Sequence, residues 1–257
     1  MKVTLHPGFH KTGTSSLQAV LRTNRRRLAP FAEILLLGNL RAAVAAATRF
    51  AQSRDAADLL AFRSGFAEAI APHRAAPALI LSCEGLSGRT PGKLGIADYR
   101  AALPLCQAMA EVLEAAFGAD LDLTLVFTTR APAAWLHSAW RHNLAGYRVT
   151  DGFEDWSARY ADAAAFGRIT EGVEALLPGH RVLTLPMEAA EQDRIGPAGP
   201  FLRQAGVPQR RLDRLGVAGL HNAGPDAEVA EALLALNRSN LGTADLKAAK
   251  AALLAQT

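Results

Sequence analysis

The sequence predicts an α/β fold in which a central parallel sheet is flanked by helices on both faces. Three short strand-like runs support this prediction: residues 2–6 (KVTLH), 78–82 (ALILS) and 121–129 (LDLTLVFTT). A segment of helical character lies after each run, and strands that alternate with helices are typical of parallel sheets. With 257 residues, the chain is near the upper end for one domain. We therefore expect residues 1–257 to form a single domain with added helices.

The other elements follow from the same periodicities and from glycine and proline positions. The helix after the first strand begins near Gly13 and carries three arginines, 25–27, in its last turn. In chain order, we then expect a short strand over residues 32–37, helical structure over 39–73, an amphipathic helix over 97–117, a helix opened by Pro132, a strand over 181–185, and helices over 201–206 and 225–255.

Composition limits the classes of partner. The formal net charge is +4, yet basic residues are not interleaved with aromatic ones and no nucleic-acid motif occurs, so we expect no nucleic acid and favour a polyanionic cofactor. No apolar run approaches the roughly 20 residues of a membrane span, and no signal-peptide pattern opens the chain. We expect a cytoplasmic protein. Cys83 and Cys106 are predicted to be buried small hydrophobic residues, and nothing in the sequence indicates an oligomeric state.

A glycine-rich loop joins the first strand to the first helix. Gly8 and Gly13 have the spacing G-x-x-x-x-G, and glycine lets the backbone curl so that successive N–H groups point inward. The following helix presents its free N-terminal N–H groups and the positive end of its dipole to the same place. The pattern therefore predicts an anion site built from backbone. A simple turn that caps the helix through Thr or Ser is the alternative interpretation.

The loop differs from that of nucleotide triphosphatases, in which Lys and Ser/Thr follow the second glycine and bind phosphate and magnesium. Here Thr14 follows Gly13, and Lys11 precedes the glycine by two residues. The next positions are the neutral hydroxyls Ser15 and Ser16. This arrangement suits a phosphate ester bound without a metal, and we predict no metal ligands.

Glu84 follows the buried strand 78–82 almost directly. In open α/β sheets, ligands bind beyond the carboxyl ends of the strands, so Glu84 is predicted at the same sheet edge as the loop. Its alternative role is to cap a turn or to pair with an arginine.

Arg130 and Ser138 form a second motif. Arg130 ends the strand 121–129, and Ser138 follows eight residues later on the next helix, slightly over two turns away. A guanidinium fork and a hydroxyl on one side are a suitable receptor for a phosphate monoester.

The loop residues 11–15 (KTGTS) resemble the 5'-phosphosulfate loop of sulfotransferases that use 3'-phosphoadenosine 5'-phosphosulfate (PAPS). Residues 125–140 (LVFTTRAPAAWLHSAW) look like the 3'-phosphate element of the same family. The resemblance implies a P-loop-like sulfotransferase fold, PAPS as cofactor and 3',5'-adenosine bisphosphate (PAP) as product. The cofactor-binding residues that it implies are Lys11, Thr12, Gly13, Thr14, Ser15, Ser16, Arg130 and Ser138.

The resemblance also implies a reaction, namely transfer of a sulfuryl group to a hydroxyl or amine of a small-molecule or saccharide acceptor. Lys11 and Glu84 are the implied catalytic residues. Glu84 is the implied base, because the base of this family commonly lies at the end of the corresponding strand. His10, His137 and His142 are alternative bases. A P-loop kinase or hydrolase, and a catalytically silent relative that binds PAPS or PAP, remain as alternative functions.

The sequence departs from the family pattern in two places. Ser16 stands where members often carry an aromatic residue that stacks on adenine. Residues 221–224 (HNAG) match the late, glycine-rich adenosine motif poorly. The adenine contacts are therefore not assigned by the resemblance.

Overall fold

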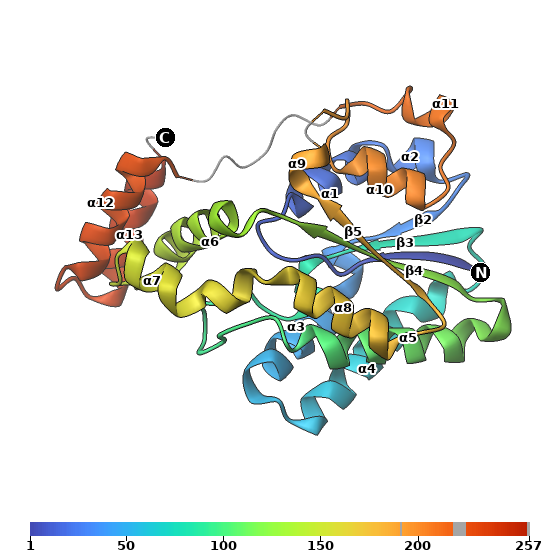
Figure 1. Ribbon diagram of the computed structural model, residues 1–257, viewed down its shortest axis with the longest axis horizontal. Helices are drawn as coiled ribbons and strands as arrows, with labels where there is room; N and C mark the ends of the chain where they lie inside the picture. The colour runs from blue at the N-terminus through green and yellow to red at the C-terminus, as the bar shows by residue number, and fades with distance from the viewer. Residues whose placement is uncertain (191, 218–224, 256–257) are drawn as a thin grey trace.

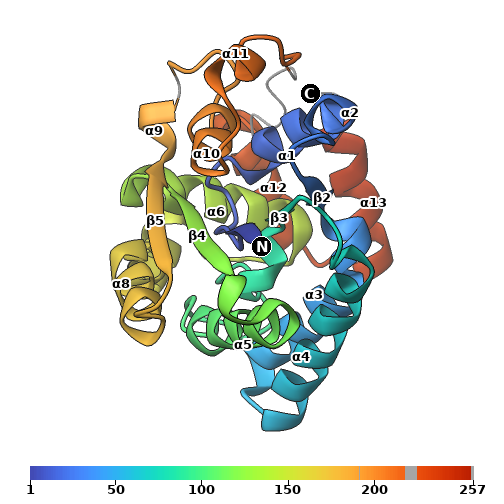
Figure 2. The ribbon, with the colours of Figure 1, turned by 90° about the vertical axis from the view of Figure 1, so that its right-hand side faces the viewer.

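The protein is built on a five-stranded sheet, which confirms the predicted fold class. The computed structural model describes residues 1–190, 192–217 and 225–255. The strand order is β2-β3-β1-β4-β5, and every pair of neighbouring strands is parallel (Figure 1). Helices cover both faces of this sheet (Figure 2).

The strands are Lys2–His6 (β1), Glu33–Leu35 (β2), Ala78–Ser82 (β3), Asp122–Thr129 (β4) and Arg181–Pro186 (β5). The α-helices are Thr14–Thr23 (α1), Arg25–Leu28 (α2), Leu37–Ser53 (α3), Ala56–Ile70 (α4), Ala102–Phe117 (α5), Pro132–Gly146 (α6), Phe153–Tyr160 (α7), Phe166–Leu176 (α8), Met187–Ala190 (α9), Ala198–Gln204 (α10), Gln209–Leu212 (α11), Ala227–Arg238 (α12) and Thr243–Leu254 (α13). Short 3-10 turns are Ala71–His73 (η1), Glu84–Ser87 (η2), Gly118–Asp120 (η3) and Ala161–Ala164 (η4).

Strand β1 lies at the centre of the sheet. Lys2 is in register with both Ala78 of β3 and Asp122 of β4, and His6 is in register with Ser82. Because all strands run in the same direction, the segments that follow β1, β3 and β4 leave the sheet at one edge. This carboxyl edge is where the sequence places its candidate site residues.

Two apolar layers hold the helices against the sheet. On one face, residues of α3, α4, α5 and α8 pack over side chains such as Val3 and Leu5 of β1. On the other face, residues of α1, α10 and α11 pack over Ile80 of β3 and Val126 of β4. Alternate residues of a strand point to opposite faces, so strands buried on both faces are apolar at most positions.

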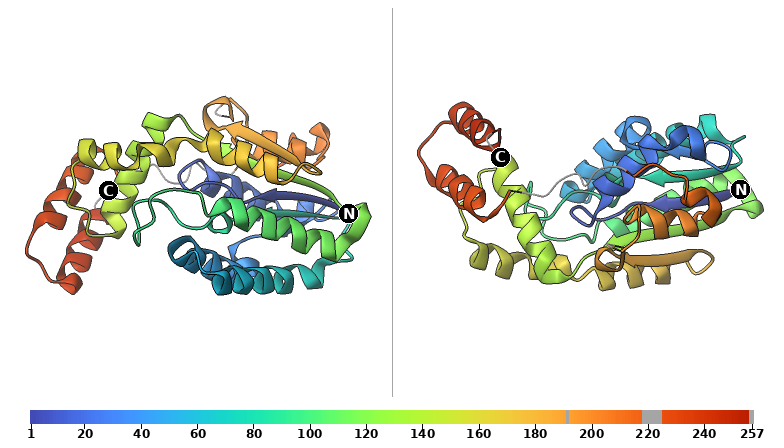
Figure 3. Two further views of the ribbon diagram at one scale, coloured as in Figure 1. Left: turned by 60° about the horizontal axis from the view of Figure 1, so that its bottom comes forward. Right: turned by 90° about the horizontal axis from the view of Figure 1, so that it is seen from above.

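Helices α6, α7, α12 and α13 lie beyond the carboxyl edge of the sheet (Figures 1 and 3). The end of α6 is tied to the last two helices by side chains that reach its final carbonyl groups. Asn237 Nδ2 of α12 donates to Leu144 O at 3.2 Å. Lys250 Nζ of α13 donates to Leu144 O at 2.6 Å and to Tyr147 O at 2.8 Å. A cation at this position also complements the negative end of the α6 dipole.

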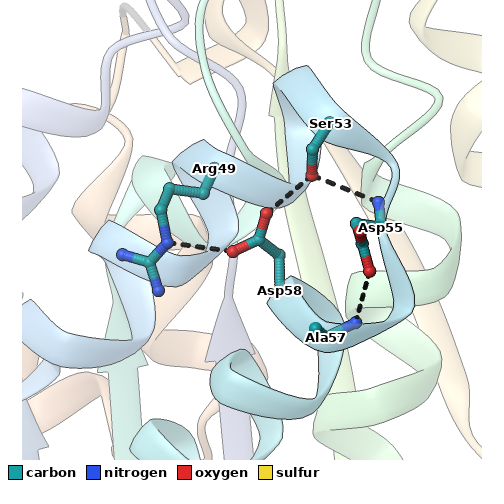
Figure 4. A network of polar contacts seen from close by, with 5 residues as sticks. All are labelled: Arg49, Ser53, Asp55, Ala57 and Asp58. Atoms are coloured by element: carbon teal, nitrogen blue, oxygen red, sulfur yellow. Dashed lines mark hydrogen bonds and ion pairs between the residues drawn. The ribbon is translucent and has the colours of Figure 1, made fainter.

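Helices α3 and α4 form an antiparallel pair whose connection is fixed by polar contacts (Figure 4). Asp55 caps α4 by accepting a hydrogen bond from Ala57 N at 2.8 Å. Asp58 accepts from Ser53 Oγ at 2.6 Å and from Arg49 Nε at 2.9 Å, which links the first turn of α4 to the last turn of α3. The helical structure predicted over residues 39–73 is confirmed as this pair and the short turn η1.

Several predicted boundaries were wrong. The helix predicted over residues 201–206 spans Ala198–Gln204. The strand predicted over residues 32–37 ends at Leu35, because Asn39 Oδ1 accepts from Leu36 N and α3 then begins at Leu37. The helix predicted from residue 97 begins at Ala102, after a turn in which Asp98 accepts from Arg100 N.

The three arginines 25–27 belong to a separate helix, α2, and not to the last turn of α1. Asn24 separates the two helices: its Nδ2 bonds Val20 O and Gly216 O, and its Oδ1 accepts from Gly216 N. Cys83 and Cys106 are buried free thiols, as predicted. Among the described residues, no helix combines the length and apolar character required to cross a membrane.

Candidate functional site

The loop between β1 and α1 takes a conformation that only a few residue types adopt readily. Gly8 and Gly13 have φ values of 61° and 90°, and Lys11 between them has φ 67°. A left-handed φ at a non-glycine residue costs roughly 1–2 kcal/mol, so the surrounding contacts must hold Lys11 in place. At Gly8 a Cβ atom would also lie 3.2 Å from the His6 ring. The predicted strand, glycine-rich loop and helix are all present.

The first carbonyl groups of the loop are held by buried hydroxyls. Ser87 Oγ of η2 donates to Gly8 O at 2.8 Å. Thr12 Oγ1 and Thr14 Oγ1 donate to Phe9 O at 2.7 and 3.2 Å. Because these hydroxyl hydrogens are used within the loop, Thr12 and Thr14 would contact a ligand through their backbone N–H groups.

The next two carbonyl groups are held by side chains from the β4–α6 segment. Trp135 Nε1 donates to His10 O at 2.9 Å, and Arg130 Nη1 donates to Lys11 O at 3.3 Å. Four successive loop carbonyls therefore have side-chain donors. A backbone whose carbonyls are directed to one side leaves its N–H groups free to face the other.

The N–H groups at the end of the loop lack protein partners. Within the described ranges, no residue accepts a hydrogen bond from the N–H groups of residues 12–16, and α1 has no side-chain cap. Ser15 is exposed and Ser16 is half-buried. Free N–H groups at the start of a ten-residue helix form an anion site together with the helix dipole.

A directed chain of hydrogen bonds supports the loop from the sheet. Thr12 Oγ1 donates its one hydrogen to Phe9 O, so Thr128 Oγ1 must donate to Thr12 Oγ1 across their 2.8 Å separation. Thr128 therefore accepts from His6 Nε2 at 3.1 Å, and Ser82 Oγ donates to His6 Nδ1 at 2.8 Å. Burial lowers the pKa of His6 to about 3, which keeps the ring neutral, as this chain requires.

Positive side chains gather in front of the loop. Lys11 is half-buried, and desolvation together with the neighbouring Arg130 lowers the pKa of its ammonium group. Lys93, in the segment between η2 and α5, is 5 % exposed, and its Nζ lies 2.8 Å from His142 Nε2 of α6. Desolvation and the cations Arg89 and Lys11 lower the pKa of Lys93 to about 8.

One tyrosine holds both basic residues of this segment. Arg89 Nη2 donates to Tyr147 Oη at 3.1 Å, and Lys93 Nζ lies 4.8 Å from the centre of the Tyr147 ring. Tyr147 follows the last turn of α6. The loop after β3 is thereby fixed against α6, and Arg89 and Lys93 lie close together.

The field of these cations reaches two histidines. Desolvation, followed by Arg89, Lys93, His142 and Lys11, lowers the pKa of His10 to about 3. Desolvation, followed by Lys93, Lys11 and Arg89, lowers the pKa of His142 to about 4. Both rings are neutral near pH 7, and further protonation is disfavoured. They are therefore weak proton acceptors.

Among the residues that the structure describes, no acidic side chain forms an ion pair with this cluster. None of the ion pairs among the described residues involves Lys11, Arg89, Lys93 or Arg130. Buried or half-buried cations without counter-ions are expensive to keep in a protein interior. An anionic ligand would remove that cost.

Glu84 begins η2 at the carboxyl end of β3. Gln18 Nε2 of α1 donates to Glu84 Oε2 at 2.9 Å and to Ser82 O at 3.2 Å, which fixes the carboxylate beside α1. Glu84 Oε1 has no hydrogen-bond partner in the described part of the chain, and no described arginine pairs with Glu84. One carboxylate oxygen is therefore available to a proton donor.

Other predicted residues lie elsewhere. Ser138 is on α6, half-buried, and its hydroxyl has no hydrogen-bond partner among the residues that the structure describes. Its pairing with Arg130 around a phosphate stays a prediction. His137 is exposed and stacks on Phe153 with ring centres 3.6 Å apart, outside the cation cluster. Residues 221–224, the expected place of the adenosine motif, lie outside the described residues.

Sequence reasoning missed Arg89, Lys93 and Tyr99 as members of the site. Tyr99 is 1 % exposed; its hydroxyl accepts from His10 N at 3.2 Å and lies 3.5 Å from His10 Nδ1. Arg89 and Lys93 belong to the polar segment that follows Glu84, whereas Tyr99 falls in the range that was predicted to be helical from residue 97. The position of the polar segment at the carboxyl end of a buried strand was the signal that could have identified Arg89 and Lys93.

Comparison with protein-family models, with curated proteins and with solved structures found no match to this chain. The site is therefore interpreted from its own geometry.

Proposed function

We propose that this protein is a PAPS-dependent sulfotransferase. The observation that carries the proposal is a loop with free N–H groups, beside which Lys11 and Arg130 lie close together. Neither cation has an acidic partner among the described residues. These groups fit a nucleotide that carries anions at two positions. In the bound complex, the acceptor oxygen or nitrogen forms a bond to sulfur while the bond from sulfur to the bridging phosphate oxygen breaks, and that electron pair stays on PAP.

Lys11 and the N–H groups of residues 12–16 have the first role. They bind the 5'-phosphosulfate and stabilise the negative charge that grows on the bridging oxygen. Their positions are fixed before the ligand arrives, because the carbonyl groups of the loop are already bonded. Preorganised donors of this kind typically contribute about 3–4 kcal/mol each to a reaction barrier.

Arg130 has the second role. Its Nη1 is held by Lys11 O, so the guanidinium lies at the edge of the loop and its other N–H groups can bind the 3'-phosphate. Together with Lys11, it aligns the bound nucleotide for in-line attack. This role distinguishes PAPS from ATP, which has no 3'-phosphate.

Glu84 is the proposed base, and its free Oε1 accepts the acceptor's proton as the new bond forms. The two histidines near the loop are weaker candidates, since desolvation and the cations lower the pKa of His10 to about 3 and that of His142 to about 4. General-base catalysis usually contributes about 10²–10⁴ in rate. We therefore expect Glu84→Gln to lower kcat by about this factor while PAP affinity is retained.

Thermal shift with PAP, AMP and ATP plus magnesium tests the nucleotide assignment. PAP at a hundred times its Kd should stabilise the fold by about 2.7 kcal/mol, which raises Tm by about 5–10 °C for a chain of this size. Arg130→Gln should lose most of this shift, whereas the control Arg22→Gln, an exposed arginine on α1, should keep it. Stabilisation by ATP plus magnesium in preference to PAP would support a P-loop kinase or hydrolase instead.

A transfer assay separates an enzyme from a silent relative. Radiolabelled PAPS and a broad panel of alcohols, amines and saccharides should give labelled product with the wild type and much less with Glu84→Gln. PAP binding without transfer to any acceptor would favour a catalytically silent binder. Retained activity in Glu84→Gln, together with its loss in His10→Gln, would assign the base to His10.

A further inference from the structure

The cations at the carboxyl edge come from two different segments of the chain. Arg130, at the end of β4, bonds the Lys11 carbonyl, and it is the cation that acts on the Lys11 ammonium group. Arg89 and Lys93 come from the segment after β3 and contact α6 through Tyr147 and His142. We call Arg89 and Lys93 the second cation group; the neutral ring of His142 lies beside Lys93.

The proposed nucleotide does not account for the second cation group. Its 5'-phosphosulfate uses Lys11 and the loop N–H groups, and its 3'-phosphate uses Arg130. Arg89 and Lys93 remain, with no acidic partner among the described residues. The cost of holding them together is visible in Lys93, whose pKa is lowered to about 8 by desolvation, Arg89 and Lys11.

Polar atoms in the same segment lack partners. Arg89 Nε and Thr90 Oγ1 are buried and have no hydrogen-bond partner within the described ranges. Lys93 uses one of its three N–H groups for His142. Arg89 and His142 are half-buried, so the group is in contact with solvent and a small anion can reach it. Structural cations that only support a fold usually have partners for these donors.

We propose that Arg89 and Lys93 bind an oxyanion of the acceptor, such as a carboxylate, sulfate or phosphate, beside the group that receives the sulfuryl. This proposal rests on the proposed sulfotransferase function and adds the substrate class. The acceptor's anion would lie at Arg89 and Lys93, so that the nucleotide and the acceptor occupy separate cation groups. Tyr147 holds Arg89 through its hydroxyl and is a positioning residue.

Sulfate titration of the PAP-saturated protein tests the proposal. PAP occupies the groups at Lys11 and Arg130, and sulfate replaces chloride at constant ionic strength while Tm is measured. The wild type should show a saturable rise in Tm. Arg89→Gln and Lys93→Met should each weaken sulfate binding about tenfold to a hundredfold, as expected for the loss of one charge-assisted contact.

Lys247→Met is the matched control for Lys93→Met, because Lys247 is exposed on α13 and has no described ion pair. It should bind sulfate like the wild type. Stabilisation by PAP in Arg89→Gln and Lys93→Met shows that these variants are folded. Tyr147→Phe removes the hydroxyl that accepts the hydrogen bond from Arg89, so it should weaken sulfate binding. A general loss of structure in this variant would instead also reduce its stabilisation by PAP.

The outcomes separate the two proposals. Sulfate binding that persists unchanged in both Arg89→Gln and Lys93→Met, or no sulfate binding by the PAP-saturated wild type, overturns the acceptor proposal and leaves the nucleotide proposal standing. A protein that ignores PAP contradicts the nucleotide proposal. In that case sulfate is titrated alone, and loss of binding specific to Arg89→Gln and Lys93→Met would still establish the second cation group as an oxyanion site.

Discussion

Two histidines four residues apart have the same low pKa, about 3, for different reasons. His6 ends β1 and is fully buried, and both ring nitrogens are hydrogen-bonded to hydroxyls. Burial alone lowers its pKa. His10 lies in the loop, half-buried, and four neighbouring cationic or basic side chains add to the effect of burial. The sheet side of the loop is thus neutral and satisfied, whereas the solvent side is charged and unpaired.

Because of this difference, we expect the two sides of the loop to have different roles. Groups with matched partners, such as His6, fix the backbone, and their contribution appears in the free energy of unfolding. The cations around His10 have no acidic partner among the described residues, and they would gain a favourable charge interaction when an anion binds. Stability and ligand binding should therefore respond to different substitutions.

Lowering the pH should have the largest effect on stability, because it acts on histidines on both sides of the loop. His6, His10 and His142 are neutral in the folded protein at pH 5, but the unfolded chain protonates each below pH 6.5. The unfolded state then binds more protons, so stability falls as the pH drops from 6.5 toward 4, by about 1.4 kcal/mol per pH unit for each histidine. Urea unfolding at pH 7, 6 and 5 measures this loss. A free energy of unfolding that stays constant over this range would contradict the assignment of neutral rings.

Replacing each histidine by alanine should show that the two residues contribute differently to the free energy of unfolding. His6→Ala leaves Ser82 Oγ and Thr128 Oγ1 without their buried partner and should lower the free energy of unfolding by about 4 kcal/mol. The His10 ring is not hydrogen-bonded to the described residues through both of its nitrogens. We therefore expect His10→Ala to lower the free energy of unfolding by about 1 kcal/mol or less. Equilibrium unfolding in urea gives both values. Equal losses would show that the two sides of the loop are not distinct.

Lys93→Met tests the charged side. The folded pKa of Lys93, about 8, lies below its usual 10.5, so the unfolded chain binds more protons between these values and wild-type stability gains about 3 kcal/mol as the pH rises from 8 to 10.5. The variant lacks this gain. The difference in unfolding free energy between the two proteins, measured at pH 7.5 and 10.5, should change by that amount; the control Lys247→Met should show no such change.

Ser87→Ala should have a small effect on stability. The variant loses the hydrogen bond from Ser87 Oγ to Gly8 O on the sheet side of the loop, at a cost of about 1 kcal/mol in unfolding free energy. Because the cations are untouched, its affinity for PAP should change little. Calorimetric titration checks this, and a large loss of PAP affinity would show that the Gly8 carbonyl is critical for loop shape.

The sequence was sufficient for three strands because these are buried runs with clear ends. The runs at 2–6, 78–82 and 121–129 became β1, β3 and β4 with boundaries that differ by at most one residue. Helix starts were less predictable where side chains compete for the backbone. Asn39 and Asp98 each accept from a nearby N–H group, and such local bonds have no periodic signal.

The site was only partly predictable. Lys11, Glu84 and Arg130 each follow a strand, and parallel topology brings such residues to one edge. Arg89 and Lys93 lie in a segment without regular structure, where the spacing of residues in the sequence does not predict the direction of their side chains. Their place depends on Tyr147 and His142, more than 45 residues later in the chain, and such contacts are fixed only by tertiary packing.

The central position of β1 has a consequence for how the chain is made. β1 and the loop are translated before β3 and β4, whose residues 78–82 and 122–129 include their partners in the sheet. Thr128 and Trp135, which support the loop, are also translated more than 100 residues after it. Such long-range pairing slows folding, so we expect β1 and its loop to become ordered only after these later segments have been made.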